Sequence, residues 1–290
     1  MPPPVSSPTR SSVRRRSDPS RQARQRQPLA KALQILELLA EAPPAERGVR
    51  EIATALRIPS TTVHRTLRHL QAEGVIESDD QTGRYRLAPR FLKLAWTTTA
   101  RFPLTRAALP IMRDLVSEVD ETAFLALYDR GRMEMTLAAK VDSSHPLQYV
   151  VEMNQWLPIY AGAGGLGIMS FLLPEERRAI MVRTRLDPIT ERTETRPAQL
   201  ERLMAGFRAR GYARTVGQRV RDAVGISAPI WAADECVIGD VVVTIPNQRF
   251  TAAREADLAK KIIRCADRIS AAINGRRPTS LAALDAEKES

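Results

Sequence analysis

Cysteine and histidine are scarce in this sequence of 290 residues, which contains two cysteines and three histidines. Cys236 and Cys265 lie far apart, and the absence of a Cys-x-x-Cys pair or Cys/His cluster argues against a zinc site and a disulfide framework. No G-x-S-x-G nucleophile elbow occurs, and none of His64, His69 and His145 has an identifiable catalytic partner. We therefore expect no metal, no cofactor and no enzymatic activity, and we interpret both cysteines as core side chains.

A long hydrophobic run is also missing. No uninterrupted apolar stretch could span a bilayer, and no signal-peptide core follows the basic N-terminus, so we expect a cytoplasmic protein without a membrane partner. Hydrophobic residues make up 43% and charged residues 27% of the chain, values that are ordinary for globular proteins. The length suits one or two domains.

Acidic residues are outnumbered by basic ones, 33 to 44, which gives a formal net charge of +11. Such an excess favours a polyanionic partner such as nucleic acid. Residues 1–27 carry seven arginines against one acid, Asp18, and contain few large apolar residues. We therefore expect a disordered basic arm over 1–27, and a disordered tail over 276–290. The arm either follows the DNA backbone or is a solvated extension.

Residues 28–88 carry the pattern of a small winged helix-turn-helix domain. Apolar residues at helical spacing predict one amphipathic helix over 29–40 and a shorter one over 49–56. Residues 57–60 read as a tight turn that contains a proline, with Ser60 as the N-cap of the next helix. The order of helix, turn and helix within about sixty residues is typical of one such module.

The third predicted helix, from Ser60 to Glu73, has two different faces. Val63, Leu67 and Leu70 fall together on one side at about 100° per residue. The opposite side offers groups that can reach base edges in a major groove, where arginine pairs with guanine and threonine contacts a thymine methyl. The candidate DNA-binding residues of this helix are Ser60, Thr61, Thr62, His64, Arg65 and Arg68.

Two short extended runs around a polar loop, over 75–78 and 84–87, predict a β-hairpin after this helix. Arg84 and Arg86 alternate with the apolar residues of the second run, so both are candidates for phosphate or minor-groove contact from a wing. A charged helix face taken alone is usually just solvated. The ordered set of elements favours DNA as the partner, with a winged helix that binds protein as the alternative.

Three segments of this domain resemble the IclR family of transcriptional regulators. Residues 29–36 (LAKALQIL) resemble the family's opening helix, and residues 60–67 (STTVHRTL) are similar to its recognition-helix motif. Residues 83–87 (GRYRL), followed by Pro89, resemble its wing and exit. The resemblance implies a regulator that binds double-stranded DNA and a small-molecule effector as a homodimer or tetramer.

The resemblance extends to about residue 273 and implies a linker helix over 89–102 that contributes to dimerisation. The apolar residues of this linker fit a buried helix face equally well. Over 103–275 helical and strand patterns are interspersed, with a hairpin over 124–139, a central strand over 238–245 and a closing helix over 252–273. We therefore expect an α+β protein: an N-terminal winged helix-turn-helix, a linker helix and a C-terminal α/β domain. The resemblance implies that this last domain is GAF-like and serves effector binding and oligomerisation.

The resemblance also implies where an effector would bind. Small residues and backbone N–H groups at a helix start suit an organic carboxylate. The resemblance to the family implies a carboxylate of a catabolic pathway, aromatic or otherwise. The sequence departs from the family pattern at Gln218, where an acid is common, at Asp222, near an expected glycine, and at Leu166, where lysine is usual. Ordinary packing is the alternative role for each pocket residue. The implied effector-binding residues are Ala163, Gly164, Thr215, Gln218, Gly225, Ile226 and Thr244.

Two other functions are compatible with parts of the sequence. Gly162, Gly164 and Gly167 form a literal G-x-G-x-x-G, with Asp187 twenty residues further on, as in dinucleotide-binding enzymes. Pro158 interrupts the strand that this motif needs before it, so we do not favour an enzyme. The other alternative is an architectural DNA-binding dimer that senses no ligand.

Overall fold

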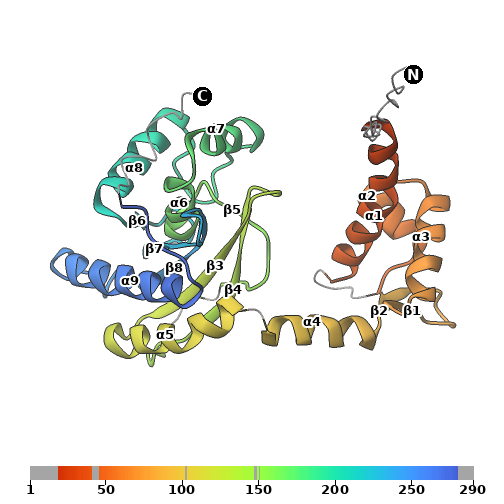
Figure 1. The fold of residues 1–290 in the computed structure, drawn as a ribbon, viewed down its shortest axis with the longest axis horizontal. Helices are drawn as coiled ribbons and strands as arrows, with labels where there is room; N and C mark the ends of the chain where they lie inside the picture. The colour runs from red at the N-terminus through yellow and green to blue at the C-terminus, as the bar shows by residue number, and fades with distance from the viewer. Residues whose placement is uncertain (1–18, 41–45, 102, 147–148, 150, 280–290) are drawn as a thin grey trace, which may run out of the picture. The chain divides into compact units, whose positions relative to one another are not determined.

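The computed structural model describes residues 19–40, 46–101, 103–146, 149 and 151–279, and it divides after Ala100 into two compact units (Figure 1). Each unit is described by itself. The first contains α1 (Pro19–Ala40), α2 (Val49–Leu56), α3 (Ser60–Ala72), β1 (Ile76–Ser78), β2 (Tyr85–Leu87) and, at its end, α4 (Pro89–Arg101).

The first unit is a winged helix-turn-helix built on one small core. The apolar faces of α1, α2 and α3 meet there, and Ile35, Ile52, Val63 and Leu67 are fully buried. The helix α3 ends before Gly74, which adopts φ +67°, a conformation that suits glycine at a helix C-terminus. The chain then forms the predicted antiparallel hairpin of β1 and β2.

Two expectations for the helix starts were wrong. The residue before the first turn of α3 is Pro59, so Ser60 is the first helical residue and not the N-cap. The expected disordered arm overlaps α1, because α1 already begins at Pro19. Residues 20–27 consist of Ser, Arg, Gln and Ala, most of them good helix formers, and extending an existing helix costs far less than starting one. The rest of the arm, residues 1–18, and most of the predicted C-terminal tail lie outside the described residues.

The second unit is a six-stranded antiparallel sheet with helices on both faces, in the strand order β5-β4-β3-β8-β7-β6. The predicted hairpin and central strand are confirmed as β3 with β4 and as β8, which lies between β3 and β7. The elements of this unit are α5 (Pro103–Val119), β3 (Thr122–Asp129), β4 (Glu134–Val141), β5 (Leu157–Pro158), α6 (Gly162–Ser170), α7 (Pro174–Arg183), α8 (Pro197–Arg210), β6 (Ala213–Val216), β7 (Ala223–Trp231), β8 (Val237–Pro246) and α9 (Ala252–Ala272).

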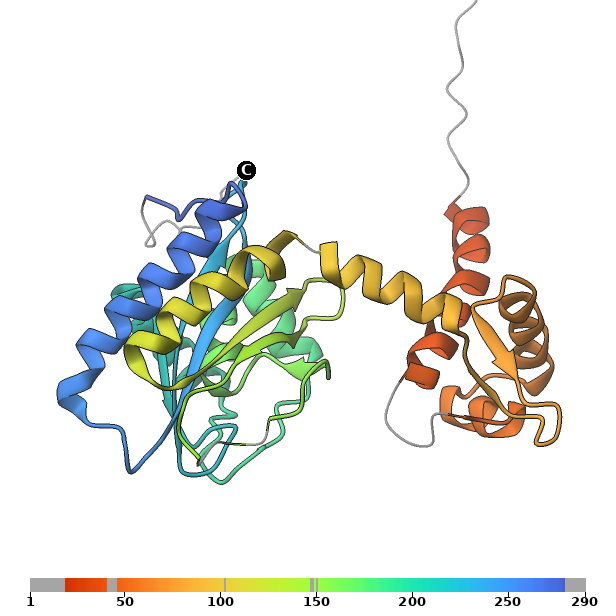
Figure 2. The same ribbon diagram turned by 90° about the horizontal axis from the view of Figure 1, so that it is seen from below.

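The sheet separates two hydrophobic cores because successive side chains of a strand point to opposite faces. One core lies under α5 and α9, which run side by side in Figure 2, and it contains Val241 and Val243 of β8. The other lies under α6 and α8 and contains Val242. Cys265 is buried in the first core as expected, whereas Cys236 is only half-buried. Among the described residues, no helix is long and apolar enough to cross a membrane.

Candidate DNA-reading helix and effector pocket

The exposed face of α3 carries the predicted DNA-binding side chains. Thr61, His64, Arg65 and Arg68 are all exposed, while Val63 on the opposite side is fully buried. The two-faced pattern expected from the sequence is therefore the one that the helix adopts. Of the other two candidates, Ser60 is exposed and Thr62 is half-buried.

The wing arginines are held by acidic groups of the same unit. The guanidinium of Arg84 donates to both carboxylate oxygens of Glu51, at 3.0 and 2.8 Å. Arg86 pairs with Glu77 at 2.6 Å and with Glu46 at 2.9 Å, and these hydrogen bonds raise the pKa of Arg86 further. Each arginine would have to exchange or share a carboxylate to bind DNA, so their role as phosphate contacts stays a prediction.

A pocket in the second unit lies beside the first turn of α6, with about 520 Å³ of space free of protein atoms, part of it open to solvent. It brings together most of the effector-binding residues that the family resemblance implied. Its remaining walls are largely apolar and include Phe124, Met135, Leu137 and Val242. The implied residues that line it are Ala163, Gly164, Thr215, Gln218, Gly225 and Thr244.

Ile226 does not belong to this pocket, and its assignment was wrong. Its side chain is fully buried in the core under α5 and α9, on the other face of the sheet. Gly225 faces the pocket, and the alternation along β7 sends the next side chain the opposite way. The resemblance located the segment, but the strand register decides which of its residues a ligand can touch.

Gly167, the last glycine of the G-x-G-x-x-G sequence, lets α6 approach the sheet closely. A Cβ added at Gly167 would lie 2.0 Å from Ser227 Oγ and 2.6 Å from Asp240 Oδ2. The element before α6, β5, is two residues long, and the next strand, β6, pairs antiparallel with β7. This is not the parallel βαβ unit of a dinucleotide-binding fold, and Gly167 serves packing here.

Arg219 lines the same pocket, and sequence reasoning did not identify it. Its guanidinium donates to the backbone carbonyl oxygens of Pro158 and Ala161. No carboxylate pairs with it among the described residues, and burial lowers the pKa of Arg219 to about 10. A partly buried cation with only neutral partners is costly, which suits a site that receives an anion.

The turn that carries Gln218 and Arg219 is held from outside the pocket by two threonines. Thr190 Oγ1 donates to the carbonyl oxygen of Gly217 at 2.6 Å, and Thr193 Oγ1 donates to that of Gln218 at 2.7 Å. Gln218 Oε1 is buried and has no hydrogen-bond donor among the described residues. The pocket therefore offers a fixed cation and a free amide oxygen next to each other.

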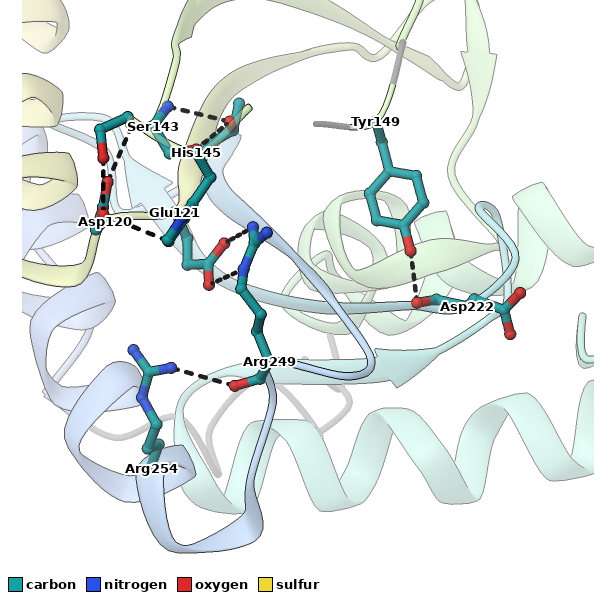
Figure 3. A network of polar contacts seen from close by, with 10 residues as sticks. Asp120, Glu121, Ser143, His145, Tyr149, Asp222, Arg249 and Arg254 are labelled. Carbon is teal, nitrogen blue, oxygen red and sulfur yellow. Dashed lines mark hydrogen bonds and ion pairs between the residues drawn. The ribbon is translucent and has the colours of Figure 1, made fainter. Parts of the chain in front are cut away.

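The connection between β4 and β5 borders the pocket and is tied to the sheet at two points (Figure 3). Ser144 donates from its backbone N–H and from its hydroxyl to the carboxylate of Asp120, each at 2.9 Å. Further along, the hydroxyl of Tyr149 donates to the backbone carbonyl oxygen of Asp222. Val151 of the same connection lines the pocket.

A nearly buried ion pair lies beside the first of these anchors (Figure 3). Glu121 is 1% exposed, and its carboxylate accepts hydrogen bonds from Arg249 at 2.6 and 3.1 Å. His145, whose partner the sequence did not reveal, has Nε2 3.3 Å from Asp120. These contacts connect the residues just before β3 to the residues just after β8 and to the β4–β5 connection. His145 therefore has a structural role in this part of the fold.

Asp240 lies beneath α6 and is fully buried. Burial raises the pKa of Asp240 well above its usual value, and the neighbouring Ser227 hydroxyl offsets only part of that rise. The folded protein therefore keeps a proton on Asp240 that the unfolded chain releases above about pH 4. Stability should fall as pH rises from that value towards the folded pKa, by at most about 1.4 kcal/mol per pH unit.

Asp240→Asn tests this proton directly, because asparagine keeps the shape of the neutral acid and cannot ionise. We expect the variant to be more stable than the wild type at about pH 8, with the difference shrinking towards about pH 5. Denaturant unfolding midpoints across that range measure the effect. A difference that does not change with pH would show that Asp240 takes up no proton on folding.

Together, a winged helix-turn-helix with an exposed polar face on α3 and a sheet domain with a partly open pocket form the architecture of a ligand-responsive transcriptional regulator. Comparison with known protein families identifies the family of this regulator. The family model for the bacterial transcriptional regulator IclR C-terminal domain matches residues 96–271, and the IclR helix-turn-helix domain matches residues 28–80. The chain belongs to the IclR family of transcriptional regulators, with an N-terminal DNA-binding domain and a C-terminal effector domain.

Curated relatives and solved structures agree with this assignment. The chain is 29% identical over 249 residues to an HTH-type transcriptional regulator of Mycobacterium tuberculosis, covering 86% of this chain and 93% of that protein. It is 30% identical over 253 residues to the glycerol operon regulatory protein of Streptomyces griseus, covering 86% and 96%. An IclR regulator structure from Silicibacter has the same fold, with a TM-score of 0.78, 24% identity and coverage of 87% and 98%. An IclR homolog from Microbacterium hydrocarbonoxydans, described as complexed with 4-hydroxybenzoate, has a TM-score of 0.70, 24% identity and coverage of 85% and 98%.

Proposed function

We propose that this regulator responds to an organic carboxylate with an apolar body, bound in the pocket beside α6. The observation that carries the proposal is Arg219, a partly buried cation that lines the pocket and pairs with no carboxylate among the described residues. The first turn of α6 adds backbone N–H groups, which favour an anion at a helix N-terminus. Phe124, Met135 and Leu137 suit an aromatic or aliphatic body. The relative described with 4-hydroxybenzoate supports this class of ligand.

We further propose that α3 binds in the major groove of DNA. Arg65 and Arg68 are exposed on its face and are the candidates for base or phosphate contact, with Thr61, Thr62 and His64 beside them. Ser60 lies at the start of the helix, where phosphate contacts are common. Arg84 and Arg86 of the wing would contact the flanking backbone once released from their acidic partners.

The proposed form is a homodimer or tetramer, because two symmetric reading heads match the two half-sites of a palindromic operator. Apolar side chains that a partner subunit could cover support it. Leu92 and Leu94 on α4 are 40% and 62% exposed in the single chain, and Leu29 and Leu33 on α1 are also exposed. Sedimentation at DNA-binding concentrations would establish the state.

A thermal-shift panel separates this sensor from an architectural protein that binds DNA without a ligand. The full-length protein would be heated with benzoate, 4-hydroxybenzoate and short-chain carboxylates, each beside its neutral amide. A ligand that binds only the folded state raises the melting temperature, by an amount equivalent to about 2.7 kcal/mol at a hundred times its dissociation constant. We expect at least one carboxylate to stabilise the protein and its amide to have little effect. No shift across the panel would favour the architectural role.

A further inference from the structure

The turn between α2 and α3 contains an arginine in an unfavourable backbone conformation. Arg57 has φ +54°, in the left-handed region where a Cβ meets the following carbonyl oxygen and glycine is preferred. It is the C-cap of α2, and its N–H donates to the carbonyl oxygen of Thr54 at 3.3 Å. Glycine would make this turn with less strain, so the arginine side chain calls for a separate explanation.

The other non-glycine residues with positive φ have explanations within the chain. Asp120, Asn154, Asp222 and Asn274 are of the two types that tolerate this conformation best. The remaining two use their side chains: Met133 packs against the core under α6, and Glu235 pairs with Arg276 at 2.8 Å.

Arg57 differs from these because its side chain has no such use. It is exposed, and among the described residues it forms no side-chain hydrogen bond and no ion pair. The wing arginines differ from Arg57 in this respect, because Arg84 and Arg86 are both paired with carboxylates. The cation of Arg57 is therefore available to a partner without any contact having to break.

We propose that Arg57 binds a DNA phosphate at the edge of the groove that α3 enters. The residue precedes Ser60, the first residue of α3, by three positions. When a recognition helix enters the major groove with its N-terminal residues at the bases, the turn before it faces the phosphates that border the groove. Arginine is well suited to such a phosphate, which it can bind through two parallel hydrogen bonds. The proposal rests on α3 being the reading helix.

The test uses the full-length protein, a duplex that the wild type enriches from a random-sequence pool, and an unrelated duplex. The affinity of R57G should be roughly 5-fold weaker on both duplexes at about 0.15 M salt, since the binding constant varies with salt to a power near −0.9 per neutralised phosphate. The slope of log affinity against log salt should be shallower by about one. R57N, which also tolerates this turn, should match R57G, and R57K should keep most of the affinity.

Stability separates this role from a defect in folding. R57G should melt at the same temperature as the wild type or higher, because the strained position is relieved. Unchanged affinity and salt slope in R57G would overturn the proposal, and so would an equal loss in R57K, which would assign the effect to the backbone of the turn. Arg65→Ala keeps the two failures distinguishable: if R57G loses affinity while Arg65→Ala and Arg68→Ala do not, Arg57 contacts DNA although the exposed face of α3 does not read it.

Discussion

Arg219→Met should weaken carboxylate binding by at least roughly 100-fold, which corresponds to about 2.7 kcal/mol. Removing one partner of a buried charge pair costs about 2–5 kcal/mol, because the other charge is left without its counter-ion. Methionine is unbranched and of similar length, so it fills much of the same space. It also removes a partly buried cation that no carboxylate of the described residues neutralises, which limits the loss of stability.

Calorimetric titration with the best carboxylate of the thermal-shift panel, and with its neutral amide, measures this effect. The wild type should prefer the carboxylate strongly, and Arg219→Met should lose that preference. Arg221→Met is a matched control, because Arg221 lies two residues further along, is 74% exposed and pairs with Glu191 on the surface. If Arg219→Met still prefers the carboxylate by the original factor, the anion is bound elsewhere, and the first turn of α6 becomes the main candidate.

Arg65→Ala should weaken binding to a selected duplex by about 1–3 kcal/mol, or roughly 5- to 150-fold, if Arg65 reads a base. The side chain is exposed on α3, so truncation should leave the fold intact. Arg65→Lys keeps the charge but not the two-pronged geometry that matches guanine. A base contact predicts that lysine restores little of the discrimination between selected and unrelated duplexes. A phosphate contact predicts that lysine restores most of the affinity, and no loss in either variant would remove Arg65 from the interface.

Local patterns in the sequence were enough to predict α3 with its two faces and the central strand. The face of α3 follows from the spacing of Val63 and Leu67, which pack into the small core of the same domain. The strand β8 follows from a run of β-branched residues that is buried on both faces of the sheet. In both cases the information lies within about a dozen consecutive residues.

The features that the sequence did not predict depend on residues that are distant in the chain. Arg219 is partly buried in the pocket wall, where its guanidinium reaches carbonyl groups about sixty positions earlier, although arginine is usually exposed. The wing arginine Arg84 forms an ion pair with Glu51. The two residues are 33 positions apart, and no periodic pattern in the sequence predicts their contact. Gly225 and Ile226 were both assigned to the pocket, but neighbouring residues of a strand face opposite sides of the sheet, so only Gly225 lines the pocket and Ile226 lies in the opposite core.

Sequence selection from a random DNA pool, carried out in parallel with the wild type and Arg65→Ala, tests most directly whether the exposed face of α3 reads DNA. The wild type should enrich a two-fold symmetric site, and Arg65→Ala should enrich the same site with the preference at one base pair of each half-site relaxed. If the wild type enriches no sequence, or if both proteins enrich an identical site at every position, the assignment of Arg65 on α3 as a base-reading residue is contradicted.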